Sequence, residues 1–188
     1  MPISLLLGRI ILTVLWAAWV CPFLLFAPKN QKRPSITSAG PTRIGLLLEC
    51  CGFILAAVFH ISASEPVAFP RLAASVLFWA PAVVVFWTAV QHLGRQFRIT
   101  AGLYEDHQLV RTGPYAIVRH PIYSSLLAML LSTICMITQW TWAIPALVLF
   151  LAGTEIRVRT EDRLLASRFG KDFADYRRRV PAYLPFVR

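Results

Sequence analysis

The chain has 188 residues, of which 57% are hydrophobic and only 15% are charged, whereas ordinary globular domains contain about 25% charged residues. A protein of this size cannot bury so much apolar surface in its own core, so lipid must cover the remainder, and an ordinary soluble protein is excluded. The formal net charge of +10 would suit nucleic acid, but most basic residues lie in loops beside apolar segments, where membrane topology explains them.

Five apolar segments follow one another and predict an all-α, polytopic membrane bundle of about five transmembrane helices. They are Leu5–Ala27, Ile44–Ser64, Leu72–Gln91, Ile122–Ile137 and Trp140–Thr154. The first is too long for a cleaved signal peptide and lacks a basic leader. The last two are short and only two residues apart, so they predict a tight helical hairpin. Trp140 and Trp142 then fall where an interfacial aromatic belt is expected.

The basic residues predict the orientation. Seventeen of the 19 lie in the loop between the first two segments, the loop between the third and fourth, and the tail beyond Glu155, whereas Arg9 and Arg71 fall on the opposite side. By the positive-inside rule the rich side is cytoplasmic, with the N-terminus outside. The absence of an organelle signal favours a prokaryotic inner membrane.

The second apolar segment contains two ionisable residues. Gly45, Glu49, Gly52, Ala56 and His60 share one helical stripe, and small residues on one face let helices approach closely. An ionisable group in a span faces the bundle or a cavity. Glu49 is either one half of a structural pair or part of a site, and His60 is interpreted as a packing or interface residue.

The four cysteines lie inside apolar segments without metal-ligand spacing. No metal site or disulfide framework is predicted, and they are interpreted as small hydrophobic packing residues. The positions are Cys21, Cys50, Cys51 and Cys135.

A polar segment before the fourth apolar segment is too rich in specific residue types for a plain connector. Residues 112–114 (Thr-Gly-Pro) are a turn signal, and Pro121 suits the first turn of a helix. Arg119 and His120 then lie at a helix N-terminus, whose free N–H groups favour an anion such as the carboxylate or phosphate of a cofactor. In the simpler interpretation, Arg119 and His120 are interfacial anchors and Tyr123 is a belt aromatic.

A second polar segment follows the fifth apolar segment. Arg157 and Glu161 are four residues apart and meet on one helix face, and Gly170 is a good helix stop. Beyond it, a short helix can lay an apolar face on the bundle through Phe173, Tyr176 and Val180. The simpler interpretation is a basic amphipathic tail on anionic lipid, which the acidic residues of this segment fit poorly.

Taken in order, these residues resemble the isoprenylcysteine carboxyl methyltransferase family, which groups with phospholipid methyltransferases of the same build. The match covers roughly residues 104–188, and the first half matches only as generic spans. The matching elements are His107-x-Leu109-Val110-x-x-Gly113-x-Tyr115, Arg119-His120-Pro121-x-Tyr123, Arg157-x-x-x-Glu161, Phe169-Gly170, Tyr176 and Val180-Pro181.

The resemblance implies a single integral membrane domain over residues 1–188, with three spans in residues 1–98 and the cofactor-binding and catalytic half in residues 99–188. It implies S-adenosylmethionine as cofactor, with S-adenosylhomocysteine as product. The substrate would be lipid-like or prenylated and would enter from the bilayer, with membrane lipids as further partners. Isoprenylcysteine-type carboxyl methylation at the cytoplasmic face is the activity that the resemblance favours.

The same resemblance implies the site residues. Arg157 and Glu161 would be catalytic, with Arg157 facing the substrate; Arg119, His120 and Glu161 would lie near the amino-acid or sulfonium end of the cofactor. The Leu109–Val110 backbone would serve its adenine end. The full set implied for cofactor binding is His107, Leu109, Val110, Gly113, Tyr115, Arg119, His120, Tyr123 and Glu161.

The methyl acceptor stays open at this point. A carboxylate is already a nucleophile, which one arginine can hold with two hydrogen bonds, whereas an amine needs a proton acceptor such as Glu161 or His120. A thiol is a third possibility. No prenyl-binding groove is identified, and Asp162 and Arg163 stand where relatives often carry further glutamates.

Two other classes of function remain as alternatives. One is an NADPH-dependent membrane reductase with a similar C-terminal cofactor region, and the other is a non-catalytic membrane protein. A soluble methyltransferase is disfavoured because no glycine-rich loop follows a strand pattern.

Overall fold

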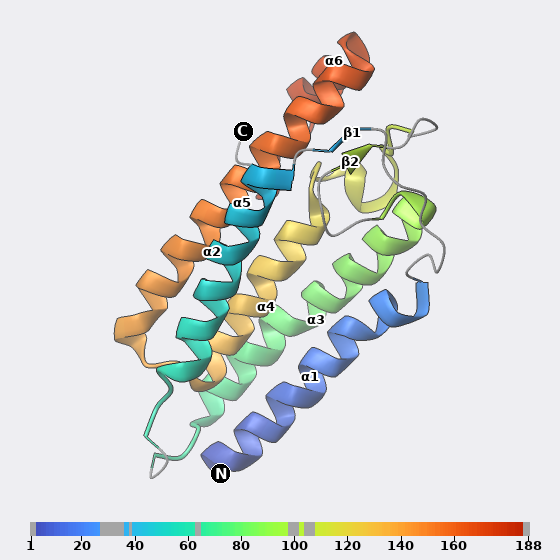
Figure 1. Cartoon of the computed structure of the whole chain (residues 1–188). Helices are drawn as coiled ribbons and strands as arrows, with labels where there is room; N and C mark the ends of the chain where they lie inside the picture. The colour runs from blue at the N-terminus through green and yellow to red at the C-terminus, as the bar shows by residue number, and fades with distance from the viewer. Residues whose placement is uncertain are drawn as a thin grey trace.

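A computed structural model of the chain describes residues 3–26, 36–37, 39–62, 65–97, 102–103 and 108–185. Within these residues, five long helices run antiparallel to one another in chain order, and a short sixth helix lies at one end (Figure 1). They are α1 (Leu5–Phe26), α2 (Ala39–Val58), α3 (Phe69–Leu93), α4 (Pro121–Ile137), α5 (Trp140–Phe169) and α6 (Lys171–Arg179). The prediction of an all-α membrane bundle is confirmed.

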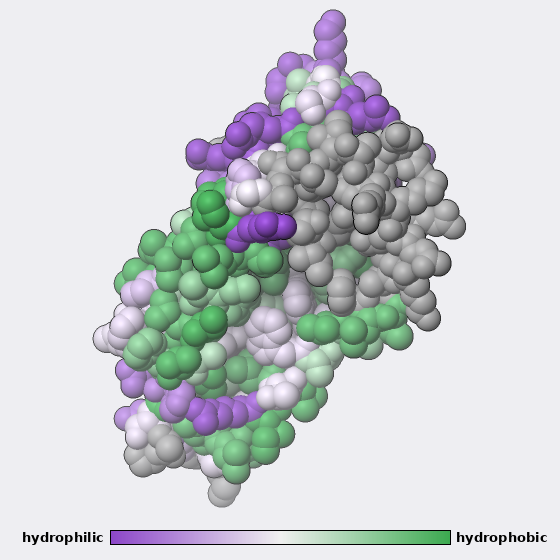
Figure 2. Space-filling view, in the orientation of Figure 1, coloured by the Kyte–Doolittle hydropathy of each residue, from purple (hydrophilic) through white to green (hydrophobic). Residues whose placement is uncertain are grey.

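The bundle exposes apolar side chains along its length. In Figure 2, hydrophobic residues gather over the middle of the bundle, and hydrophilic residues gather at the end that carries α6. Among the large apolar residues that are more than half exposed are Ile10, Leu47, Ile54, Leu77, Val84, Ile144 and Val148. A water-soluble surface does not carry so many, so this chain is an integral membrane protein.

Three helical stretches are long and apolar enough to cross a bilayer, namely Gly40–Val58, Phe69–Leu93 and Trp140–Phe169. Two shorter apolar stretches, Leu5–Cys21 and Pro121–Ile137, complete the bundle. All five correspond to the five predicted segments.

The predicted hairpin of two short helices needs correction. Residues 138–139 do join α4 to α5, but α5 is 30 residues long and continues to Phe169, because residues 155–169 contain no glycine or proline. It ends at Gly170, whose φ of 50° is a left-handed conformation that favours glycine. Moreover, α5 packs mainly against α2, while α4 packs mainly against α3.

The α2–α5 contact depends on the small residues of the predicted stripe. A Cβ atom added at Gly45 would lie 2.7 Å from the carbonyl oxygen of Gly153, and one added at Gly52 would lie 2.7 Å from that of Ala146. The backbones therefore touch, as expected for glycine-mediated packing. His60 does not belong to this stripe, because α2 ends at Val58. Its ring Nδ1 lies 2.7 Å from the carbonyl oxygen of Ile61.

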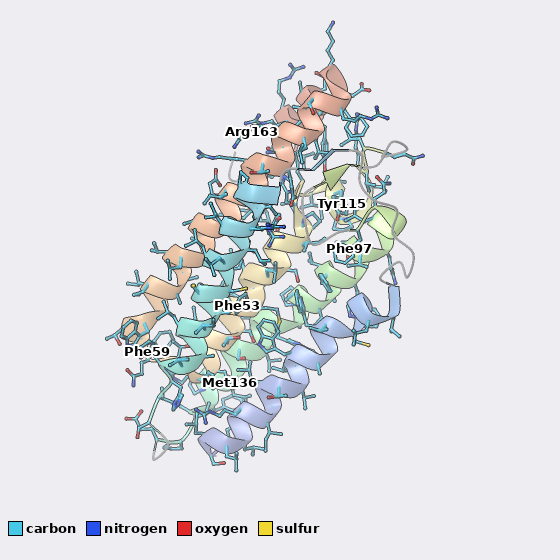
Figure 3. All side chains as sticks on the ribbon, viewed as in Figure 1. Phe53, Phe59, Phe97, Tyr115, Met136 and Arg163 are labelled. Atoms are coloured by element: carbon cyan, nitrogen blue, oxygen red, sulfur yellow. The ribbon has the colours of Figure 1, made fainter. Side chains whose placement is uncertain are left out.

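The interior between α1, α3 and α4 is aromatic. The rings of Trp19 and Phe86 stack with centroids 4.3 Å apart, and the indole N–H of Trp19 donates to the Ser125 hydroxyl at 2.7 Å. Figure 3 shows Tyr115, Phe97, Phe53 and Met136 following the bundle from the α6 end toward the opposite end. The four cysteines are free.

Two short features complete the α6 end. Strand β1 (Ile36–Thr37) pairs antiparallel with β2 (Gly102–Leu103) and links the loop after α1 to the loop after α3. The turn predicted at residues 112–114 is seen as the 3-10 turn η2 (Gly113–Ala116), and a further 3-10 turn, η1 (Gly94–Gln96), follows α3.

Candidate functional site

A cavity of about 450 Å³ opens near the α6 end of the bundle. Its lining comes from all six helices and from the segment before α4. One part is aromatic, with Trp16, Trp19, Phe53, Phe86 and Phe97. The other part is polar and charged, and its members come from the segment between α3 and α4 and from α2, α4, α5 and α6. A cavity with an apolar wall and a few convergent polar groups is the usual form of a small-molecule site.

The segment after α6 closes the polar part by binding the N-terminus of α4. The backbone N–H groups of Arg119 and His120 donate to the carbonyl oxygens of Pro181 and Ala182, both at 2.8 Å, and the Ser124 hydroxyl donates to that of Tyr183 at 2.5 Å. The two polar segments picked out in the sequence therefore fold against each other.

These bonds correct one prediction. The N-terminus of α4 was expected to offer free N–H groups to an anion. The amides of Arg119 and His120 are instead used by the C-terminal segment, and those of Tyr123 and Ser124 lie within 3.4 Å of the His120 carbonyl oxygen. Since Pro121 has no N–H either, the start of α4 offers an anion far fewer backbone donors than expected.

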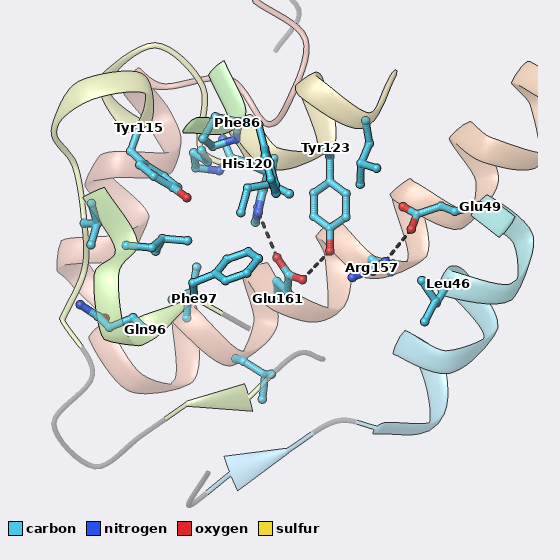
Figure 4. A pocket seen from close by; sticks show the side chains of 18 of the residues that line it. Leu46, Glu49, Phe86, Gln96, Phe97, Tyr115, His120, Tyr123, Arg157 and Glu161 are labelled. Carbon is cyan, nitrogen blue, oxygen red and sulfur yellow. Dashed lines mark hydrogen bonds and ion pairs between the residues drawn. The ribbon is translucent and has the colours of Figure 1, made fainter. Parts of the chain in front are cut away.

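A buried acid–base network joins α4 to α5. Asp162 accepts hydrogen bonds from Arg119 and from His120 Nε2, both at 2.9 Å. The other ring nitrogen of His120 lies 3.2 Å from Glu161, which also accepts the Tyr123 hydroxyl at 2.5 Å. Figure 4 shows His120 and Tyr123 reaching Glu161 with Phe97 beside it. Of the two acids in this network, Glu161 is the more exposed, with 26% of its side chain accessible against 9% for Asp162.

The environment of His120 stabilises its charged form. Burial by itself would lower the pKa of this imidazole, but hydrogen bonds and charge interactions with Asp162 and Glu161 outweigh burial and raise the pKa from 6.5 to about 9. His120 is therefore protonated at neutral pH and donates to both carboxylates. It is not the proton acceptor in this state.

A second ion pair lies on the same wall, nearer the middle of α5. Arg157 Nη1 donates to Glu49 Oε2 at 2.5 Å, and the Thr154 hydroxyl donates to the other carboxylate oxygen at 2.9 Å. The guanidinium also lies over the ring of Tyr123, 5.0 Å from its centroid. Of the two interpretations of Glu49, structural pairing is confirmed, and the residue also lines the cavity.

Tyr115 places an unpaired polar atom at the cavity. Its hydroxyl is buried and finds no hydrogen-bond partner within the described part of the chain. Burial raises the pKa of this hydroxyl well above 10, so it stays a neutral donor. The backbone carbonyl of the same residue accepts the Tyr176 hydroxyl at 2.6 Å. A buried hydroxyl is rarely left unpaired, so this atom fits a hydrogen bond to a bound molecule.

Most of the predicted site residues come together in this cavity. Its lining includes Leu109, Val110, Tyr115, Arg119, His120, Tyr123, Arg157 and Glu161. Gly113 does not line it; its φ of 59° is left-handed, and any Cβ there would collide with the His92 ring, so it shapes the turn. His107 lies outside the described residues.

Sequence reasoning did not assign two acids that the structure places at the site. Asp162 was noted only as a departure from related sequences, yet it holds both Arg119 and His120. Glu49 was noted as an ionisable residue within a span, and the expectation that such a residue faces the bundle or a cavity is confirmed. Its partner could not be identified, because Arg157 is 108 residues away.

Fold and site together define an integral membrane helical bundle with a charged cavity at one end. A family model for the isoprenylcysteine carboxyl methyltransferase (ICMT) family matches residues 74–167, which is half of the chain. The chain belongs to this family. The matched region contains most of the network described above.

Curated relatives agree with this assignment. Protein-S-isoprenylcysteine O-methyltransferase B of Arabidopsis thaliana is 35% identical over 102 residues, 53% of this chain and 52% of the plant protein. The Cobalt-zinc-cadmium resistance protein CzcN of Cupriavidus metallidurans is 36% identical over 92 residues, 47% of this chain and 42% of that protein. Protein-S-isoprenylcysteine O-methyltransferase of Schizosaccharomyces pombe is 31% identical over 83 residues, 44% and 35% respectively. The aligned part spans about half the length, or less, of these relatives.

Proposed function

We propose that this chain is an S-adenosylmethionine-dependent methyltransferase that acts on a lipid-like substrate. The observation that carries the proposal is the cavity itself, in which a buried acid–base network on α4 and α5 meets an aromatic wall inside a membrane bundle. The relatives named protein-S-isoprenylcysteine O-methyltransferase support the same reaction class.

The residues present suit such a cofactor. Glu161, held by His120 and Tyr123, is a partly exposed carboxylate that complements a sulfonium cation. The unpaired Tyr115 hydroxyl offers a donor to a polar group of the cofactor, and the Leu109–Val110 segment lines the cavity where an adenine end would bind. When bound, the cofactor supplies an electrophilic methyl group.

The protein aligns the methyl donor with the acceptor and keeps water out of the site. In-line displacement at a methyl carbon needs the acceptor and donor held in line more than it needs strong acid–base help. Arg119, tied to Asp162 and to the Arg177 and Val180 carbonyls, holds the C-terminal segment over the cavity. The aromatic wall excludes water and suits an apolar tail.

The orientation follows from charge. The cavity lies at the end that carries α6, whose last turn is Arg177, Arg178 and Arg179. By the positive-inside rule we propose that this end faces the cytoplasm, with the N-terminus outside. The membrane we propose is a prokaryotic inner membrane. The described helices pack into one bundle, which we propose to be a single domain.

Binding of radiolabelled S-adenosylmethionine to protein purified in detergent tests the proposal directly. The label should bind and should not be displaced by excess NADPH. Displacement by NADPH would favour a membrane reductase, and absence of binding would favour a non-catalytic membrane protein.

Two substitutions test the site. Glu161→Ala and Arg157→Lys should each reduce methyl transfer by about 100-fold or more, a range typical for loss of a positioned acid–base or orienting group. The matched controls are Glu155→Ala and Arg159→Lys, which form an exposed pair with the same spacing on the same helix and should leave the rate unchanged. Normal rates in Glu161→Ala and Arg157→Lys would refute the assignment.

A further inference from the structure

Helix α3 ends beside the segment that lines the adenine part of the proposed cofactor site. Gly94, with a φ of 51°, follows the last residue of the helix, and the turn η1 then brings Gln96 to the cavity. The next residue, Phe97, is 5% exposed and packs edge-on against Phe86, with ring centroids 6.3 Å apart. Because Phe97 is anchored in the core, the backbone of Gln96 is held in place.

The Gln96 side chain holds the backbone of that segment. Its carboxamide oxygen accepts a hydrogen bond from the Gln108 N–H at 2.9 Å. Leu109 and Val110, which follow directly, line the same cavity as Gln96. Figure 4 shows Gln96 at one end of the cavity and Glu49 at the other. Gln96 therefore supports the end of the cavity that lies opposite Glu49.

The end of α3 also contacts the segment at a second point. Gly113 packs so closely on the ring of His92 that a Cβ atom added to it would collide with that ring. The ring is fixed in turn, because its Nδ1 lies 2.7 Å from the carbonyl oxygen of Thr88. Residues 109–110 thus lie between two attachments to the end of α3, one at Gln108 and the other at Gly113. A short segment held at both ends needs little further ordering when a ligand binds.

We infer that Gln96 is a positioning residue for the cofactor, which acts on the adenine end through the backbone of residues 108–110; the inference rests on the proposed function. Without the Gln96 carboxamide oxygen, the first attachment is lost, and the segment has to be ordered at the moment of binding. The loss weakens every ligand that carries the adenine group, by about the three- to tenfold that one net hydrogen bond contributes. The sulfonium end of the site, at Glu161, is unaffected.

Two ligands distinguish the two ends of the cofactor site. S-adenosylmethionine carries both the adenine group and the sulfonium, whereas 5′-methylthioadenosine carries the adenine group and a neutral sulfur. Their dissociation constants are measured on the purified protein, by binding of radiolabelled S-adenosylmethionine and by its displacement with 5′-methylthioadenosine. Gln96→Ala should raise both constants about three- to tenfold, whereas Glu161→Ala should raise mainly that of S-adenosylmethionine. The unfolding midpoint of Gln96→Ala should equal that of the wild type, because the Gln96–Gln108 hydrogen bond is exposed.

Two further variants make the test specific for the carboxamide oxygen. Gln96→Glu keeps an oxygen for the Gln108 N–H and removes the amide nitrogen, so both dissociation constants should stay close to those of the wild type. Gln91→Ala is the matched control, because Gln91 is an exposed glutamine near the end of the same helix and does not line the cavity. It should leave both constants unchanged.

The outcomes separate this inference from the proposed function. Unchanged constants in Gln96→Ala, or a lower unfolding midpoint in that variant, overturn the positioning role. Equal weakening in Gln96→Glu overturns it as well, because the effect would then come from the amide nitrogen. A wild-type protein that binds the label but does not release it to 5′-methylthioadenosine overturns the inference alone. A wild-type protein that does not bind the label overturns the proposed function itself.

Discussion

Helix α5 carries two polar contacts about one turn apart, and they are built differently. Near the middle of the helix, Arg157 and Thr154 hold Glu49 in a compact contact enclosed by glycine packing against α2. One turn further, Glu161 and Asp162 belong to a network that includes a protonated histidine. The first contact fixes two helices to each other, whereas the second fixes a site and the C-terminal segment that covers it.

The difference shows how one helix can serve packing and chemistry at once. The Glu49 contact depends on the close approach of two helix backbones, and none of its three members is a histidine. The network depends on hydrogen bonds that respond to protonation and to loss of single acids. Three experiments test this contrast, in order of decreasing expected effect.

Removal of Asp162 should be the most damaging change to the network. Asp162→Ala leaves the buried Arg119 and the protonated His120 without their shared carboxylate, and breaking a buried ion pair in this way costs about 3–5 kcal/mol. Thermal unfolding in detergent should show a much lower midpoint, and labelled S-adenosylmethionine should bind weakly. Asp172→Ala, on an exposed part of α6, is the matched control. Equal midpoints for the two variants would contradict the central place of Asp162.

The network, unlike the Glu49 contact, should respond to pH. The pKa of His120 is about 9 in the folded protein against 6.5 when unperturbed, so its stabilising contribution is complete below about pH 6.5 and is lost as pH rises through about 9. At its largest this contribution is on the order of 3 kcal/mol.

Unfolding midpoints of wild type and His120→Gln, measured from about pH 6 to pH 10, check this prediction. The wild-type midpoint should fall toward the alkaline end, and the difference between the two proteins should shrink over the same range. A difference that is constant with pH would mean that His120 is neutral in the folded protein.

The α2–α5 contact should respond to volume instead. Gly153→Ala adds a Cβ atom within 2.9 Å of the Glu49 backbone nitrogen, and overpacking of this kind costs about 1–3 kcal/mol. Gly40→Ala is the control, because nothing lies within 4 Å of a Cβ added there. The midpoint should fall for Gly153→Ala and stay unchanged or rise for Gly40→Ala. Equal midpoints would show that the contact between α2 and α5 accommodates an extra methyl group without cost.

Much of the fold could be predicted from the sequence because apolar segments of sufficient length have few alternatives to membrane helices. The five segments, the helix start at Pro121 and the stop at Gly170 are all seen. The length of α5 was underestimated, because hydropathy ends near Thr154 while the helix itself continues to Phe169. Helix propensity, rather than apolar character, sets that boundary.

Most of the candidate site was also predicted, since Arg119, His120, Arg157 and Glu161 stood in recognisable order along the chain. What could not be predicted was which group each one binds. Arg157 was expected to face a substrate, and its partner in the structure is Glu49, from a helix that resembled only a generic span.

By itself, the sequence determined that the chain spans a membrane, which segments form its membrane helices, and which polar residues stand near one end. Those properties depend on local composition and periodicity. Only the tertiary structure decided that α5 packs on α2, that the C-terminal segment uses the amides before α4, and that Glu49 binds Arg157. These contacts join residues far apart in the chain, and the choice among possible partners is made by helix packing, which no local pattern encodes.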